Sequence, residues 1–219
     1  MLAIAVLSFA LPTVSPTMAQ DERPEAAEMP EALVAGVDEL SLGYPELLEI
    51  EWAEYSDGGI VAWLPDIFYL QPLQELRESA DEEAAHDPED YAMQFLALDT
   101  VNADDDYTML IYVTRFPWSS RYNSSALEMA HLTALVSSPE FERQLEPVEY
   151  NLEGYDAAYT EDVVTTEEGK TIVMAYFIID TDFFYTVNFA MPPETQEINR
   201  VVFELAIKTM TFELDDEES

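Results

Sequence analysis

The 219-residue chain has no cysteine, which excludes disulfide bonds, thiolate metal ligands and cysteine-dependent catalysis. Glycine is scarce as well, with six residues, and the sequence holds neither a G-x-S-x-G nucleophile elbow nor a glycine-rich phosphate loop. The two histidines, His86 and His131, are far apart in sequence and neither has a histidine four residues away, which favours structural roles over metal binding. The sequence therefore predicts a protein that is not an enzyme, and a hydrolase is only the third hypothesis.

Positive charge is also rare. Eight Lys and Arg residues accompany 46 Asp and Glu residues, for a formal net charge of −38 at pH 7. Such a chain repels the phosphates of nucleic acids and of anionic membranes, so neither is expected as a partner. Two explanations of the acidity stay open. One is a salt-adapted surface, as in halophilic or marine exported proteins; the other is a surface that collects cations. The acids are spread along the chain rather than grouped at ligand spacing, which favours the first explanation.

The same charge predicts a response to salt. We expect the melting temperature to rise from low to near-molar sodium chloride, because screening weakens the repulsion among the acidic residues. A thermal-melting series in which the melting temperature falls over this range would contradict the prediction.

The N-terminal residues have the pattern of an export signal. Residues 2–12 are almost wholly apolar and too few to span a bilayer as a helix, and Thr17-Met18-Ala19 ends on a small residue just before the first charges. This pattern predicts a signal peptide at residues 1–19 and an exported protein, periplasmic or extracellular. The basic residues that usually begin such a signal are missing, and an ordered strand and a retained anchor are the alternatives.

The remaining chain is divided by composition into three parts. Residues 20–45 are acidic and rich in proline and alanine, which predicts a linker with a short helical turn around residues 31–37. Residues 46–213 are long enough for a single domain, and residues 214–219 form an acidic tail.

A strongly apolar block, TIVMAYFIIDTDFFYTVNFAM, covers residues 171–191. It predicts two strands, 171–179 and 183–191, joined by the turn at Asp180–Asp182. Both faces of the first strand are apolar, so we expect it at the centre of a sheet and covered on both sides. A membrane-spanning helix would place Asp180 and Asp182 near the middle of the bilayer, at a cost of about 3 kcal/mol each. No integral membrane span is therefore expected in the mature chain.

Other elements follow from hydrophobic spacing and turn residues. Ser125 and Glu128 form an S-x-x-E capping box that begins a helix, and Pro139 ends it. Further helices are expected at residues 72–85 and 194–209, with a short turn at 141–145. The expected strands cover residues 48–53, 60–64, 91–98, 107–114, 147–152 and 155–164.

The order of these elements resembles the PsbP-like fold, which is found in PsbP and in exported PsbP/DcrB-like domains. The resemblance is carried by the stretches SSALEMAHLTALV, NLEGYDAAYTE, GKTIVMAYFIIDTDFFYTVNFAMPPE and INRVVFELAIKTMTF. It implies an α+β domain in which helices cover both faces of an antiparallel sheet, an α/β/α sandwich. It implies no single activity, and members typically act as assembly or binding modules.

One acid-free window, residues 107–127, is a candidate contact surface. It holds Arg115, Phe116, Trp118, Arg121 and Tyr122, and these residue types are enriched at protein-binding hot spots. The alternative stays open: the two large apolar rings complete the core where a strand meets a helix, and the arginines pair with surface acids.

A second candidate site is the run Asp104, Asp105 and Asp106, which resembles the start of a calcium loop. Tyr107 stands where such a loop has glycine, and Val113 stands where it has glutamate, so a polar turn is the simpler interpretation. Apart from this calcium, no cofactor is predicted.

The leading hypothesis is a non-catalytic exported binding or assembly module for an unknown protein or small ligand. A protein that binds calcium with low affinity is the second hypothesis.

Overall fold

The computed structural model describes residues 28–71, 73, 92–99, 109–118, 124–135, 141–165 and 169–212. Several predictions lie outside these residues: the signal peptide, the first part of the linker, nearly all of the helix at 72–85, the Asp104–Asp106 run and the acidic tail.

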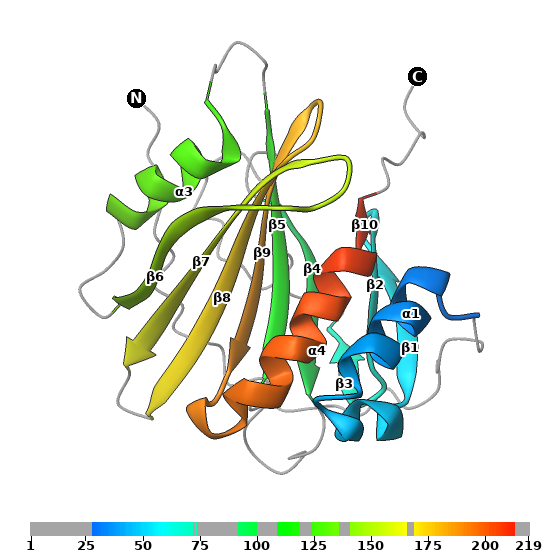
Figure 1. Ribbon diagram of the computed structural model, residues 1–219. Coiled ribbons are helices and arrows are strands. Elements are labelled where there is room, and N and C mark those ends of the chain that lie inside the picture. The colour runs from blue at the N-terminus through cyan, green and yellow to red at the C-terminus, as the bar shows by residue number, and fades with distance from the viewer. Residues whose placement is uncertain are drawn as a thin grey trace, which may run out of the picture.

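The described chain forms two antiparallel sheets and the helices that pack on them (Figure 1). The seven-stranded sheet has the order β3-β4-β5-β9-β8-β7-β6, and the three-stranded sheet has the order β1-β2-β10. The strands are β1 (Trp52–Asp57), β2 (Ile60–Pro65), β3 (Phe68–Leu70), β4 (Ala92–Asp99), β5 (Leu110–Pro117), β6 (Phe141–Tyr150), β7 (Asp156–Thr165), β8 (Lys170–Ile179), β9 (Phe183–Met191) and β10 (Thr211–Phe212). The helices are α1 (Glu31–Leu40), α3 (Ala126–Leu135) and α4 (Gln196–Thr209), with short 3₁₀ helices η1 (Pro45–Glu49) and η2 (Pro193–Thr195).

Strand β8 lies between β7 and β9, and helices cover both of its faces, as predicted. Met174, Tyr176 and Ile178 enter the larger core, which they share with α4 and the three-stranded sheet. Ala175 and Phe177 enter a smaller core beneath α3. The alternation of a strand therefore sends the apolar residues of β8 into two separate cores, which confirms the sandwich of helices and sheet.

The predicted capping box begins α3. The backbone N–H of Glu128 donates to Ser125 Oγ (3.2 Å), and the backbone N–H of Ser125 donates to Glu128 Oε2 (3.0 Å). Both bonds satisfy donors that an uncapped helix end would leave without partners.

Two predicted elements are corrected. Residues 48–49 belong to the 3₁₀ helix η1 rather than to a strand, because Pro45 favours the start of a helical turn. Leu47 is consequently buried, while Leu48 is 63% exposed. The short turn predicted at 141–145 is the first half of β6, which pairs with β7 from Phe141 onward. Strand β7 is remote in sequence, and pairing with it outweighs the local turn signal at Pro139.

Part of the predicted linker belongs to the folded domain. Helix α1 is longer than the turn predicted at 31–37, and it packs against α4. Leu33 is fully buried, and Val37 and Leu40 pack on the larger core. The acidic and alanine-rich composition predicted a linker and gave little weight to this apolar stripe. The helix is stable because α4 covers the stripe.

The turn between β1 and β2 leads to a testable substitution. Gly58 has a φ of +55°, and a Cβ at this position would lie 2.4 Å from the carbonyl oxygen of Gln94 in β4. We expect Gly58→Ala to lower the free energy of unfolding by about 2 kcal/mol, from backbone strain plus the close approach. Gly154→Ala is the matched control, because Gly154 also has a positive φ (+86°) but no atom within 4 Å of the added Cβ. Equal losses in urea unfolding would show that the approach to β4 has no effect.

Candidate functional site

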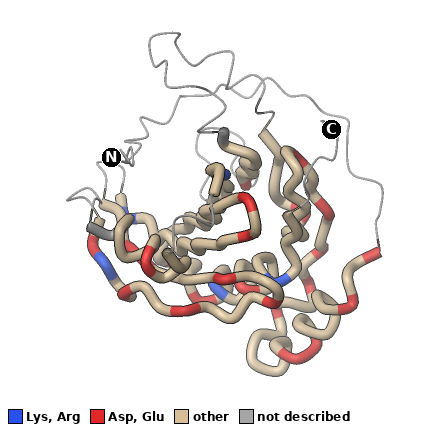
Figure 2. The backbone as a smooth tube through the Cα atoms, turned by 90° about the horizontal axis from the view of Figure 1, so that it is seen from above, with Lys and Arg blue, Asp and Glu red and all other residues tan. Residues whose placement is uncertain are grey.

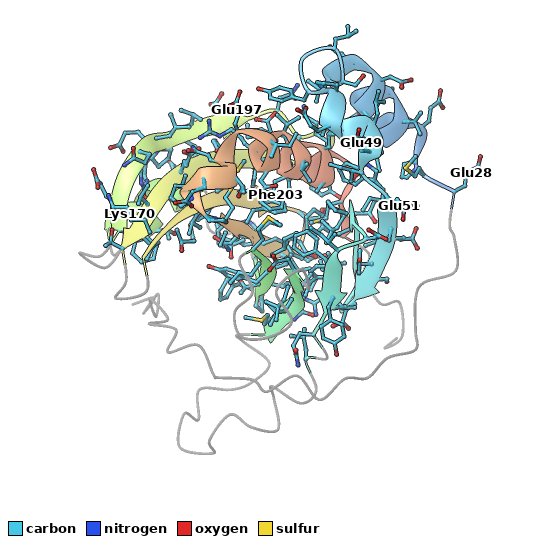
Figure 3. The ribbon with its side chains drawn as sticks, turned by 90° about the horizontal axis from the view of Figure 1, so that it is seen from below. Glu28, Glu49, Glu51, Lys170, Glu197 and Phe203 are labelled. Carbon is cyan, nitrogen blue, oxygen red and sulfur yellow. The ribbon has the colours of Figure 1, made fainter. Side chains whose placement is uncertain are left out.

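A hollow of about 370 Å³ lies beside α4, at the end of the molecule where this helix begins. Three neighbouring pieces of chain form it: residues 49–51 before β1, residues 65–68 at the turn from β2 to β3, and one side of α4. Met109, just before β5, completes the wall. Figure 3 views this end of the molecule, with Glu49 and Glu51 near β1 and Phe203 on α4. We call this space the α4 hollow.

The walls of the α4 hollow are mostly apolar. Helix α4 contributes Ile198, Val202 and Phe203, and the β2–β3 turn contributes Ile67 and Phe68. The start of α4 is set by Pro192 and by Pro193 in the preceding 3₁₀ helix, since proline suits a first helical turn. These side chains offer a surface that favours an apolar molecule over water.

Hydrogen bonds hold the β2–β3 turn against the first strand. The backbone N–H of Asp66 donates to the Glu51 carbonyl oxygen (2.8 Å). The Tyr55 hydroxyl lies 2.8 Å from the Phe68 carbonyl oxygen and 3.4 Å from that of Pro65. The turn is thereby joined both to β1 and to the residue that precedes it.

Asn199 is the amide among the lining residues. Its Nδ2 donates to Thr195 Oγ1 (2.8 Å) and lies 3.0 Å from Met109 Sδ. Met109 is itself fixed by Asp99, whose Oδ1 accepts from the Met109 backbone N–H (3.0 Å). The amide N–H groups of Asn199 are thus directed to the protein, and its Oδ1 is by its chemistry a hydrogen-bond acceptor.

The rim of the α4 hollow is acidic. Glu49, Glu51 and Asp66 line it and are exposed to solvent. Of the Lys and Arg residues that the structure describes, none lines the hollow. Figure 2 shows acidic positions at many places along the described chain with few basic positions among them. The rim is therefore a negatively charged edge around an apolar space.

The pKa of Tyr55 makes the stability of the fold at this wall depend on pH. Burial, assisted by the nearby Asp66 carboxylate, raises the pKa of Tyr55 to about 12. A tyrosine in the unfolded chain ionises near pH 10. The folded-state pKa is the higher one, so the stability from this group is complete below about pH 10 and is lost as the pH rises through about 12.

We therefore expect urea unfolding to show a steep loss of stability between about pH 10 and 12. Burial also raises the pKa of Tyr112 and Tyr150 to about 12, so part of this loss is common to other tyrosines. Tyr55→Phe has no hydroxyl to ionise at this position, so it should lose less stability than the wild type between about pH 10 and 12. Identical losses in the wild type and the variant would contradict the assignment.

The described fold is similar to that of cyanobacterial PsbP (CyanoP) from Synechocystis sp. PCC 6803. The two structures align with a TM-score of 0.51 and 11% sequence identity over 74% of this chain and 93% of that protein. The chain has a PsbP-like fold. LpqN of Mycobacterium tuberculosis, involved in cell envelope biogenesis, aligns with a TM-score of 0.43 and 12% identity over 75% of this chain and 92% of LpqN. No protein-family model and no curated protein matches the sequence.

The PsbP-like fold separates the residues of the predicted contact surface. Phe116 and Trp118 pack on Phe184 in the core beneath α3, with ring centroids 6.1 and 5.8 Å from it. Arg115 points to the other face of β5, where its guanidinium lies 4.7 Å from the Phe183 ring centroid. These positions agree with the alternative in which the large rings complete the core. Arg121 and Tyr122 lie outside the described residues, and partner binding by this window stays a prediction.

Among the described residues, no three His, Cys, Asp or Glu side chains gather as a metal site would require. The Asp104, Asp105 and Asp106 run and His86 lie outside that part of the chain, so calcium binding stays a prediction. His131 is exposed on α3. In the same described part, no helix has the length and hydrophobicity needed to cross a membrane.

Sequence reasoning missed the α4 hollow in this PsbP-like fold. Its residues are spread along the chain from Glu49 to Phe203, and no sequence motif connects them. One local signal was present: Pro65 ends a strand and Asp66 follows it, which marks a turn whose end can line a site.

Proposed function

We propose that this chain is an exported, non-catalytic binding module and that its ligand occupies the α4 hollow. The observation that carries the proposal is the hollow itself, because its volume of about 370 Å³ lies within the range of small-ligand sites. Apolar walls with a few polar groups at the rim are the usual composition of such sites.

Two features support a role in binding rather than catalysis. The residues that line the α4 hollow include no His, Ser, Thr or Lys, so no common nucleophile stands next to a base there. The three carboxylates at the rim are exposed to water, whereas enzymes usually keep water away from the groups that carry out the reaction. A PsbP-like fold is compatible with an accessory binding domain, although a fold by itself selects no function.

Export is supported by the signal-like pattern of residues 1–19. A small exported module of this kind would carry or sense its ligand outside the cytosol. Secretion of a fusion that carries residues 1–27 ahead of a reporter tests this part, and a reporter retained in the cytosol would contradict it.

Binding in the α4 hollow is tested by filling it. Ile198→Trp places a larger side chain into the space from α4, and Glu197→Trp adds the same group to the exposed neighbouring position as a control. A thermal-shift screen with neutral, cationic and anionic fragments should give compounds that raise the melting temperature of the wild type and of Glu197→Trp by several degrees. These compounds should leave Ile198→Trp unchanged. Hits that stabilise all three proteins equally would place the ligand elsewhere, and a screen without hits would contradict the proposal.

A further inference from the structure

We infer that the ligand of the α4 hollow is an aliphatic cation, with a primary ammonium group attached to an apolar body. This inference rests on the proposed function and names the chemical class of its ligand. It combines the charge at the rim, the hydrogen-bonding groups that the lining offers and the apolar character of the walls.

Among the residues that the structure describes, no Lys or Arg lies at the rim of the α4 hollow. Glu49, Glu51 and Asp66 line the α4 hollow, while the described arginines act elsewhere. Arg143 and Arg200 pair with carboxylates on β7, and Arg115 lies over Phe183. The field of these three carboxylates attracts a positive group to the hollow, whereas it repels an anionic ligand.

The polar side chains of the lining offer acceptors. Carboxylates accept hydrogen bonds, and the Asn199 amide directs its N–H groups to Thr195 and Met109 rather than to a ligand. An ammonium group has three donors and no acceptor, which matches such a lining. A phosphate, sulfate or carboxylate would find acceptors facing its own oxygens.

The apolar walls distinguish an organic cation from a metal ion. Ile198, Val202 and Phe203 form one side of the space, and burying methylene groups against such side chains favours binding. A metal ion gains nothing from these contacts, and no three acidic or histidine side chains among the described residues gather to coordinate one. The apolar body thus supplies affinity, and the ammonium group supplies specificity.

The experiment uses the full chain and three probes that share an eight-carbon body: octylamine, 1-octanol and sodium octanoate. Isothermal titration calorimetry near pH 7 and at moderate ionic strength should show octylamine binding at least tenfold more tightly than 1-octanol, and octanoate not binding. Ammonium chloride at the same concentration, which lacks the apolar body, should give no site-specific heat. A short peptide with one lysine between leucines indicates whether a protein side chain can supply the same ammonium group.

Substitutions then assign the selectivity to the rim. The double variant Glu51→Gln with Asp66→Asn should weaken octylamine binding at least tenfold and leave 1-octanol binding unchanged, because it removes two charges but keeps the shape. Glu153→Gln with Glu142→Gln is the control, since these exposed acids belong to other parts of the chain and do not line the hollow. This control should bind octylamine as the wild type does.

The affinities of these probes and variants separate the ligand class from the proposed function. Equal affinity for octylamine and 1-octanol, or unchanged octylamine binding in the rim variant, would overturn the cationic class. The proposed function would survive that result if Ile198→Trp still abolishes binding of 1-octanol. If Ile198→Trp binds every probe as the wild type does, the hollow is not the site and both proposals are wrong.

Discussion

Replacing Phe189 with alanine is expected to lower the free energy of unfolding by about 3–5 kcal/mol, the usual cost of removing a buried phenylalanine ring. Phe189 lies on β9 and is fully buried. Its ring centroid is 4.7 Å from that of Phe203 on α4 and 5.8 Å from that of Tyr176 on β8. Loss of the ring leaves a cavity between helix and sheet that these neighbours cannot fill without moving.

Urea unfolding followed by circular dichroism measures this loss, with Leu48→Ala as the control. Leu48 is also a large apolar residue but is 63% exposed, so its truncation should change stability by no more than about 0.5 kcal/mol. Equal midpoints for the two variants would mean that Phe189 does not join helix and sheet as the structure shows.

Arg200→Met is expected to cost about 2–4 kcal/mol, because it leaves the carboxylate of Glu161 buried without its cationic partner. The Arg200 guanidinium lies 2.6 Å from both oxygens of Glu161. The Glu161 side chain is 9% exposed, and it also accepts hydrogen bonds from Gln196 (3.1 Å) and Tyr159 (2.9 Å). The Arg200 side chain is 39% exposed, so solvent screens part of the interaction and the cost stays below that of a fully buried pair.

Lys208→Met is the matched control, since it removes the same charge from an exposed position on the same helix. Its effect on the urea midpoint should be small. Adding Glu161→Gln to Arg200→Met should recover part of the lost stability, because the buried charge is then gone as well. A double variant that is less stable than Arg200→Met alone would contradict this account.

Local sequence patterns predicted several elements correctly, and each depends on contacts between residues close in the chain. The capping box at Ser125 and Glu128 is satisfied within one helical turn. The meander of β8 and β9 follows from a short turn between two apolar runs. The β1–β2 turn contains Gly58 and Gly59, which both adopt positive φ.

The errors arose where remote partners decide the conformation. The strand predicted from residue 107 to 114 extends to Pro117 in β5, because β9 supplies partners as far as Phe183. That extension places Arg115 and Phe116 on opposite faces of β5, and partner binding by their window stays a prediction. Alternation along a longer strand would have separated them, had the end of β5 been known.

The sequence by itself determined an acidic, cysteine-free chain with a two-sided central strand, because charge, the absence of thiols and hydrophobic alternation are local properties. Only the tertiary structure decided that residues 49–51, the turn at Asp66 and one side of α4 enclose a common space. The proximity of segments so far apart in the chain is set by the packing of α4 between two sheets, and no local pattern encodes it.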